Sequence, residues 1–183
     1  MSDFFTDYNK HVEERKQEGI PPLALNKDQA AQVVELLQNV PAGKGDQLLD
    51  LIKNRINPGV DPAAQVKADF LIGLVKGSYK CDLISKTDAI ETLGTMMGGY
   101  NLAGLVSIVE ENNDLSGHAA KQLKKMPLSV NVFEEVLALS KKGNDIATGI
   151  VKSWAEAEWF TNLEEVPKSM KSVVYKVDAE INT

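Results

Sequence analysis

The sequence predicts an all-α fold of about nine helices, most of them paired as stacked helical hairpins. Apolar residues recur three or four positions apart through most of the chain, which is the spacing of one buried helix face. Proline, glycine and capping residues interrupt this spacing at short intervals. After a first helix over residues 4–18, these signals delimit hairpins over 27–56, 62–93, 102–126 and 132–160.

Capping and terminating residues set the boundaries in the first half of the chain. Asparagine and serine are good N-caps, and aspartate followed by proline suits the start of a helix. Asp88 follows Ser85 by three residues, which resembles a capping box. In chain order the signals are Gly19, Pro21-Pro22, Asn26, Asn57-Pro58-Gly59, Asp61-Pro62, Gly77 and Ser85.

The second half repeats these signals. We expect Asn101, Asn131 and Asn144 to cap helices, and Ile146, Ile150, Trp154 and Phe160 to line the last one. Hairpins recurring every thirty to forty residues or so favour a HEAT- or armadillo-like solenoid, although the loops share no consensus. An irregular helical bundle would give a similar pattern.

The end of the chain follows a different pattern. Val173, Tyr175 and Val177 alternate with period two, which predicts a β-strand. A single strand cannot pair its own backbone in an all-helical domain. We therefore expect a helical domain over 1–165, and a linker with the first strand of a following, incomplete domain over 166–183. A disordered tail, or a strand docked against a neighbour, is the alternative.

Composition narrows the class of protein. A formal net charge of −6 argues against nucleic acid as the partner of this domain, because phosphate contacts need clustered Lys and Arg. No apolar run is long enough to span a bilayer, so no membrane association is expected. The acidic start does not resemble a secretory signal, and the single cysteine, Cys81, fits a reducing compartment. We expect a cytoplasmic protein.

The residues supply no catalytic, cofactor-binding or metal-binding constellation. His11 and His118 are far apart in sequence, and Cys81 has no evident activating partner. Residues 42–45 (AGKG) lack the spacing and the preceding strand of a phosphate-binding loop. These observations favour an interaction or scaffolding domain.

The candidate interaction site is the 94–101 segment (GTMMGGYN), between two predicted helices. Its three glycines allow unusual backbone angles or close approach of another backbone, and its methionines and tyrosine are large and adhesive. It is either a tight turn with methionines filling gaps or a contact surface for another domain. Under the second interpretation the interface candidates are Met96, Met97, Gly98, Gly99, Tyr100 and Asn101, with Trp159 and Phe160 at a domain junction.

Several long stretches, in the same order along the chain, resemble a known family. They are residues 8–15 (YNKHVEER), 54–61 (NRINPGVD), 93–101 (LGTMMGGYN), 147–160, which contains KSWAEAEWF, and 175–183 (YKVDAEINT). Along almost its full length, the chain is similar to the N-terminal portion of the bacterial aconitate hydratase B family. The resemblance implies a HEAT-like helical domain that precedes a swivelling domain and a catalytic body.

The resemblance also implies an activity for the complete enzyme. Members of this family interconvert citrate and isocitrate through cis-aconitate in the citric acid cycle, and also act on 2-methylaconitate. They use a 4Fe-4S cluster held by three cysteines as a Lewis acid. Cys81 does not match those ligands, so no catalytic, cofactor or metal residue carries over and the fragment is expected to be non-catalytic.

The implied partners are the catalytic and swivel domains of the same enzyme. In the family the helical domain helps to shape access to the active site and is implicated in iron-dependent homodimer formation. Cluster-free members bind messenger RNA, which the acidic charge of this domain does not support by itself. A free-standing helical-repeat adaptor is the alternative function.

Overall fold

The computed structural model describes residues 3–126 and 130–156, and this part of the chain contains nine α-helices, one short 3₁₀-helix and no strand. The helices are α1 (Phe4–Gln17), α2 (Lys27–Gln38), α3 (Gly45–Asn54), α4 (Pro62–Lys76), α5 (Lys86–Leu93), α6 (Leu102–Glu110), α7 (Ser116–Lys124), η1 (Val130–Val132), α8 (Phe133–Lys141) and α9 (Asp145–Ala155). The all-α prediction is confirmed. The predicted strand lies outside the described residues, as does Phe160.

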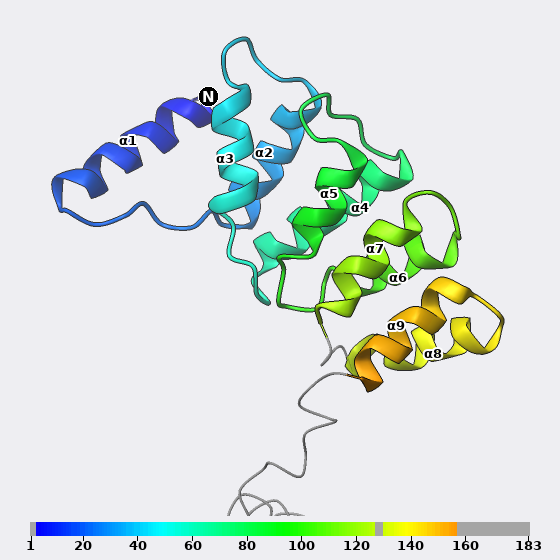
Figure 1. Ribbon diagram of the computed structural model, residues 1–183. Helices are drawn as coiled ribbons and strands as arrows, with labels where there is room; N and C mark the ends of the chain where they lie inside the picture. The colour runs from blue at the N-terminus through cyan, green and yellow to red at the C-terminus, as the bar shows by residue number, and fades with distance from the viewer. Residues whose placement is uncertain (1–2, 127–129, 157–183) are drawn as a thin grey trace, which may run out of the picture.

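The helices form two layers of stacked antiparallel pairs (Figure 1). The pairs are α2/α3, α4/α5, α6/α7 and α8/α9, and each packs against the next pair in the chain. Helices α2, α4, α6 and α8 form one layer, while α5, α7 and α9 pack in sequence in the other. Helix α1 lies at the end of the stack beside α3, where the Asn9 side chain accepts a hydrogen bond from Gln47. The predicted stack of hairpins is therefore present.

Several helix starts follow the predicted capping residues. Asn26 and Ser85 form capping boxes with Gln29 and Asp88, and the Asp61 side chain accepts the Ala63 N–H at 2.8 Å. Asn144 caps α9 by accepting the Ala147 N–H at 2.9 Å. Local sequence chemistry is thus sufficient at these four boundaries.

Two predicted caps are wrong. Asn131 falls inside η1, and α8 starts at Phe133 after Val132, with no side-chain cap. Asn101 precedes α6, but its side chain makes no hydrogen bond to the start of that helix. It is buried and turned toward the preceding helix, so tertiary packing overrides the local capping preference.

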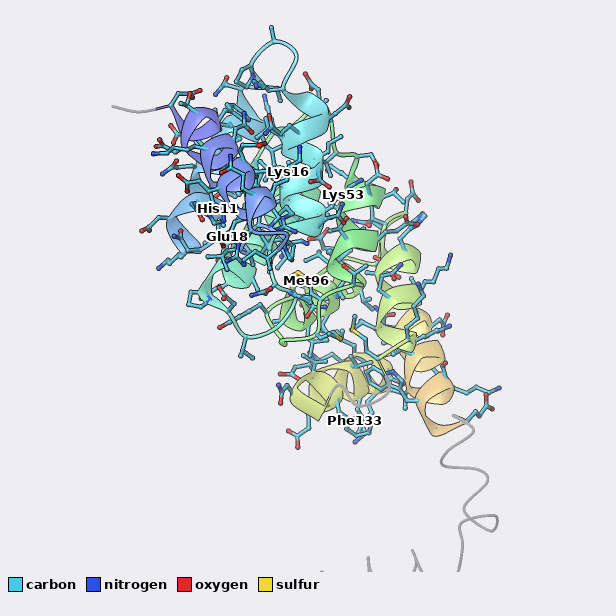
Figure 2. All side chains as sticks on the ribbon, turned by 90° about the vertical axis from the view of Figure 1, so that its left-hand side faces the viewer. His11, Lys16, Glu18, Lys53, Met96 and Phe133 are labelled. Atoms are coloured by element: carbon cyan, nitrogen blue, oxygen red, sulfur yellow. The ribbon has the colours of Figure 1, made fainter. Side chains whose placement is uncertain are left out.

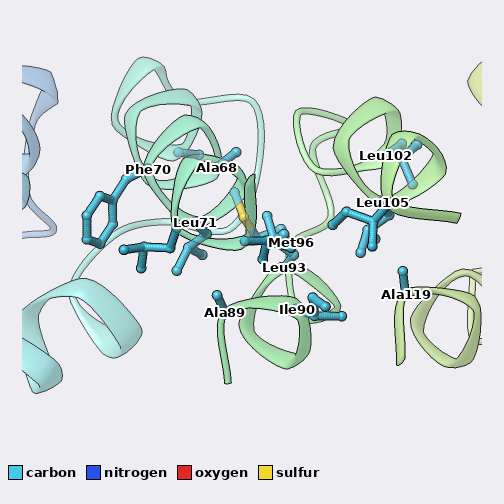
Figure 3. Packing of buried hydrophobic residues seen from close by; sticks show 14 of the residues in the cluster. Ala68, Phe70, Leu71, Ala89, Ile90, Leu93, Met96, Leu102, Leu105 and Ala119 are labelled. Carbon is cyan, nitrogen blue, oxygen red and sulfur yellow. The ribbon is translucent and has the colours of Figure 1, made fainter. Parts of the chain in front are cut away.

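The core runs continuously along the stack, between the two layers. Figure 3 shows Leu71 from α4 lying toward Leu93 from α5, with Phe70 on one side of this contact and Leu105 from α6 on the other. Trp154 closes the described end, where its indole N–H donates to the Leu123 carbonyl at 2.9 Å. The prediction that Trp154 belongs to the core is confirmed.

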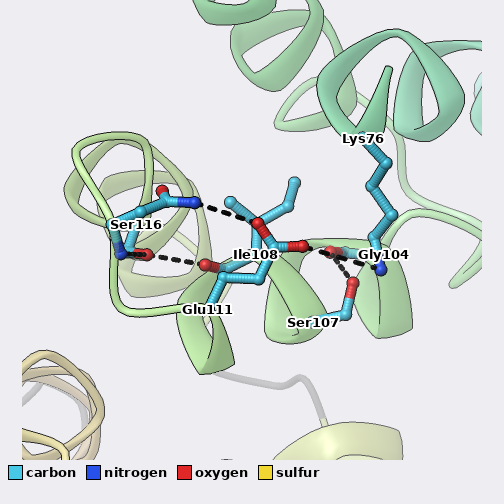
Figure 4. Close-up of polar contacts among 7 residues, drawn as sticks. Lys76, Gly104, Ser107, Ile108, Glu111 and Ser116 are labelled. Atoms are coloured by element: carbon cyan, nitrogen blue, oxygen red, sulfur yellow. Dashed lines mark hydrogen bonds and ion pairs between the residues drawn. The ribbon is translucent and has the colours of Figure 1, made fainter. Parts of the chain in front are cut away.

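Polar contacts also join the pairs along the side of α6. The Lys76 ammonium approaches a Glu111 carboxylate oxygen at 4.0 Å, and the Ser116 hydroxyl donates to the Ile108 carbonyl at 2.6 Å (Figure 4). The Asn144 amide donates to the Val109 carbonyl at 3.1 Å. These bonds fix the end of α6 to its neighbours α4, α7 and α9.

The connection between α3 and α4 and the connection between α5 and α6 lie along one edge of the stack, the lower edge in Figure 1. We call this the connecting edge. It carries residues 55–61 and the 94–101 segment, and α9 also ends there. The turns within each pair lie along the opposite edge. The candidate interaction segment therefore lies beside the connections of the neighbouring pairs.

Candidate functional site

The 94–101 segment is held against the connection between α3 and α4. The Met97 N–H donates to the Pro58 carbonyl at 2.8 Å, and the Tyr100 hydroxyl donates to the Val60 carbonyl at 3.2 Å. These bonds join two loops that are about forty residues apart in sequence. The result is a paired-loop surface, consisting of residues 57–60 and 94–101, at the connecting edge.

Each glycine of the segment meets a different steric demand. A Cβ on Gly94 would lie 2.3 Å from the Gln122 Oε1 atom, so α7 approaches the end of α5 closely. A Cβ on Gly98 would lie 1.9 Å from the Gly59 carbonyl oxygen, which is backbone and cannot rotate away. Gly99 has a φ of +91°, an angle that favours glycine. The three glycines are therefore required by close approach or by backbone conformation.

The two methionines point in opposite directions. Met96 is only 2% exposed and packs in the core beside Leu93, as Figure 3 shows, whereas Met97 is 81% exposed. Val60, on the adjoining loop, is 75% exposed. The paired-loop surface thus presents two large apolar side chains to solvent on a backbone fixed by hydrogen bonds.

This geometry narrows the predicted interface. Met96 and Asn101 are buried, so their side chains are unavailable for contact with another domain in this conformation. Met97 is exposed, and Gly98, Gly99 and Tyr100 are half-buried. Trp159 and Phe160 lie outside the described residues. The tight-turn interpretation thus accounts for Met96, while Met97 is left to the contact interpretation.

Asn101 closes the end of α5 from inside the domain. Its amide donates to the Leu93 carbonyl at 2.7 Å and to the Met96 carbonyl at 3.2 Å. These carbonyls lie at the end of α5 and in the following turn, where no further helical N–H is available. The Asn101 Oδ1 atom is buried and has no hydrogen-bond partner among the described residues. Its role is structural, and it orders the backbone from which Met97 projects.

The sequence interpretation missed the adjoining loop and one further apolar residue. Val60 belongs to the 54–61 segment that resembles the family and was not among the interface candidates, although its side chain is 75% exposed. Phe133, at the start of α8, is 42% exposed, and Figure 2 shows it at the end of the molecule beyond Met96. An apolar residue between glycine and aspartate, as in Gly59-Val60-Asp61, is the signal that could have identified the first.

The donor set of the chain does not fit an iron–sulfur cluster. Such a cluster needs several thiolates, and the sequence has the single Cys81, which is half-buried against the core. Within residues 3–126 and 130–156, no group of three His, Cys, Asp or Glu side chains is placed to hold a metal ion. None of the helices in these ranges is long and apolar enough to cross a membrane.

Comparison with known proteins identifies the family. The family described as "Aconitate B N-terminal domain" matches residues 7–160. Aconitate hydratase B of Pseudomonas aeruginosa is 49% identical over 96% of this chain, and that of Escherichia coli K12 is 45% identical over 97%. Aconitate hydratase B of Helicobacter pylori is 42% identical over 100% of the chain.

The match covers a limited part of these relatives. The chain spans about a fifth of their length, 20% for the Pseudomonas and Escherichia proteins and 21% for the Helicobacter protein. The identity extends beyond the 94–101 segment across nearly the whole chain, in agreement with the stacked helical pairs described above. The chain belongs to the aconitate B N-terminal domain family.

Proposed function

We propose that this chain is the helical docking and access domain of an aconitate hydratase B. In this proposal the complete enzyme interconverts citrate and isocitrate through cis-aconitate in the cytoplasm, with a 4Fe-4S cluster held outside this chain. The helical domain packs its connecting edge against the catalytic and swivel domains. It shapes the route to the active site and performs no chemistry itself.

The exposed pair Met97 and Val60 is the observation that carries the docking proposal. Both side chains are mostly exposed, yet the backbones that carry them are tied together by the Met97–Pro58 and Tyr100–Val60 hydrogen bonds. Rigid, exposed apolar side chains lose little conformational entropy when a partner covers them. Such a surface is suited to a permanent contact within one protein.

Surface variants of the complete enzyme test this proposal better than variants of the buried glycines. Met97→Ser with Val60→Ser removes apolar area without touching the core, because both side chains face solvent. We expect faster proteolysis between the helical domain and the catalytic body, and a several-fold lower kcat/KM for citrate. The isolated 183-residue chain should keep its melting temperature.

A matched control lies at the opposite edge. Val40 belongs to the turn between α2 and α3 and is also an exposed valine. Val40→Ser should leave both proteolysis and kcat/KM of the complete enzyme unchanged. Equal effects of the two sets of variants, or no effect of either, would show that the connecting edge is not the docking surface.

The non-catalytic part of the proposal is tested on the chain alone. One cysteine cannot provide the three thiolates of the family's cluster. After iron–sulfur reconstitution, the 183-residue chain should show neither cluster absorbance nor citrate dehydration. Stoichiometric cluster incorporation or turnover by the chain itself would refute this assignment.

Self-association is the remaining proposal drawn from the family. The exposed apolar residues of the connecting edge support self-association of the isolated chain, because a dimer would cover them where no catalytic body is present. Light scattering of the 183-residue chain, with and without ferrous iron, should show a dimer that Met97→Ser weakens. A monomer at every protein and iron concentration would remove self-association while leaving the docking proposal in place.

A further inference from the structure

A cavity of about 550 Å³ lies where α3, α4 and α5 meet. Its rim carries Lys53 and Asn54 from the end of α3, and Asp88 and Glu91 from α5. Figure 2 shows Lys53 near the end of α3, between that helix and α5. The cavity exists because α3 and α5 do not pack closely together, unlike α5 and α7.

Lys67 forms the inner wall of this cavity. It lies on α4, three residues before Phe70, and points into the space between the two layers. The side chain is only 2% exposed, so it is one of the most deeply buried groups of the domain. Fully buried lysines are rare unless a partner neutralises the charge.

The described residues satisfy Lys67 only in part. Its ammonium donates one hydrogen bond, to the Lys53 carbonyl at 3.1 Å, near the end of α3. No carboxylate oxygen of the described chain lies within 4.0 Å of the Lys67 Nζ atom. An ammonium has three N–H donors, so further acceptors are needed. Burial without a counter-charge also lowers the pKa of Lys67 to about 8.

Neither acidic residue at the rim forms an ion pair with Lys67. Asp88 accepts hydrogen bonds from the Ser85 hydroxyl at 2.6 Å and from the Ser85 N–H at 3.2 Å. The hydrogen bonds from Ser85 lower the pKa of Asp88, and the nearby positive charge of Lys53 lowers it further. Glu91 is exposed on the rim. The buried positive charge of Lys67 therefore has no dedicated counter-ion in the described part of the domain.

We propose that this cavity binds a small oxyanion, and that the ammonium of Lys67 is the main group of the protein that holds it. The ligand class is a compact carboxylate or phosphate, whose oxygen accepts the N–H groups that the Lys53 carbonyl leaves open. The cavity volume is within the range of small-molecule sites. Thr92 and Thr95 line the same cavity, but their hydroxyls already donate to the Asp88 and Thr92 carbonyls, so they offer no hydrogen to an oxyanion and Lys67 is left as the buried donor.

The rim limits the size and the charge of the ligand. Glu91 and Asp88 would repel a large polyanion, whereas a small anion can sit at depth on Lys67 beside the exposed Lys53. The cavity borders the paired-loop surface through Pro58 and Thr95, but neither Met97 nor Val60 lines it, so the anion site does not depend on the docking proposal.

Nuclear magnetic resonance on lysine-labelled 183-residue chain tests the site directly. Sodium phosphate and sodium acetate are titrated in separate experiments at constant ionic strength, with sodium chloride as the compensating salt. We expect one of the two anions to shift the Lys67 side-chain resonance saturably and to raise its pKa, because a bound anion favours the charged form. The anion that binds identifies phosphate or carboxylate as the ligand.

Thermal unfolding with matched variants supplies an independent measurement. Lys67→Met keeps the length and the apolar stem of the side chain, and should weaken anion-dependent stabilisation at least about tenfold in apparent affinity. Lys53→Met is the control, and should weaken it less than about fivefold because Lys53 is exposed. A Lys67 resonance that neither anion shifts saturably, or equal anion effects in wild type and Lys67→Met, would overturn the proposal.

Discussion

Two junctions in the same layer of this domain are built in opposite ways. Between α5 and α7 the helices pack closely, and Gly94 leaves just enough room for the Gln122 side chain. Between α3 and α5 they stand apart around a cavity whose inner wall is Lys67. Gln122 and Lys67 are both almost fully buried.

The difference lies in how each buried polar group is satisfied. The Gln122 Oε1 atom accepts a hydrogen bond from the Lys125 ammonium at 3.1 Å, so this neutral amide finds a partner inside the domain. The Lys67 ammonium carries a full charge, and within residues 3–126 and 130–156 it has one carbonyl acceptor. A helical stack can close a junction around a neutral group, whereas a buried cation leaves a requirement that a ligand can meet.

The largest expected effect comes from the contact between the two loops of the paired-loop surface, beside these junctions. Gly98→Ala places a Cβ against the Gly59 carbonyl oxygen, which is backbone. Because the two loops must separate to relieve this clash, we expect a loss of about 3 kcal/mol or more in the free energy of unfolding. Urea unfolding of the 183-residue chain measures it. Gly59→Ala, on the other side of the same contact, faces open space and should change stability by less than about 1 kcal/mol.

At the junction between α3 and α5, the burial of Lys67 predicts that the free energy of unfolding depends on pH. The pKa of Lys67 is lowered from 10.5 to about 8 by burial, while the unfolded chain keeps its proton up to the ordinary value. Between these pH values the unfolded state binds more protons, so stability rises with pH, by roughly 2–3 kcal/mol.

Lys67→Met should remove this rise and be at least as stable as wild type near neutral pH, because the uncompensated charge is gone. Urea unfolding from about pH 7 to about pH 10.5, in buffers free of oxyanions, compares the two proteins. Parallel curves for wild type and variant would mean that Lys67 is not held as a buried cation, and the contrast between the junctions would disappear.

A smaller effect on stability is expected from adding a methyl group at the junction between α5 and α7. Gly94→Ala directs a Cβ toward the end of the Gln122 side chain, which can move at a cost of about 1–2 kcal/mol. In a Gln122→Ala background the same change should cost less, and the double-mutant cycle isolates that coupling. Gly117→Ala on α7, with nothing near its added Cβ, should instead stabilise the domain by up to about 1 kcal/mol. Additive effects of Gly94→Ala and Gln122→Ala would remove steric closure as the explanation.

The smallest effect on stability is expected at the rim of the cavity between α3 and α5. The pKa of Asp88 is lowered from 3.8, chiefly by the hydrogen bond from the Ser85 hydroxyl. Its stabilisation is present above the unfolded value and is lost as pH falls through the lowered pKa. Asp88→Asn keeps an acceptor for Ser85, so it should be slightly less stable at neutral pH and equal to wild type in strong acid. Acid unfolding followed by circular dichroism measures the difference, and an equal gap at every pH would contradict it.

Local chemistry accounts for what the sequence could and could not predict. Asn26, Asp61, Ser85 and Asn144 act on neighbours two or three residues away, so their spacing was sufficient. Asn101 has the same local signal, but its amide bonds to carbonyls at the end of the preceding helix. Whether an asparagine at this position caps the following helix or bonds to the end of the preceding one depends on how α5 packs beside the 94–101 segment.

The prediction of the candidate sites was limited in the same way, because the sequence does not show which segments pack together. The composition of the 94–101 segment identified an unusual loop, but the opposite directions of Met96 and Met97 depend on its bonds to residues 58 and 60. Lys67 was overlooked because lysine is usually exposed. Its position between Ala63 and Phe70 on a helix that is buried nearly all round was the available signal.

The stacking of each pair on the next has a consequence for how the chain acquires its structure. Closely packed helices are neighbours within a pair or members of adjacent pairs, so the contacts of the core span short stretches of sequence. A domain with such contacts has low contact order, and its folding does not wait for distant segments to meet. Each pair can form on the one before it as the polypeptide leaves the ribosome. The paired-loop surface, which lies between α3 and α6, is then complete before the α8/α9 pair is made.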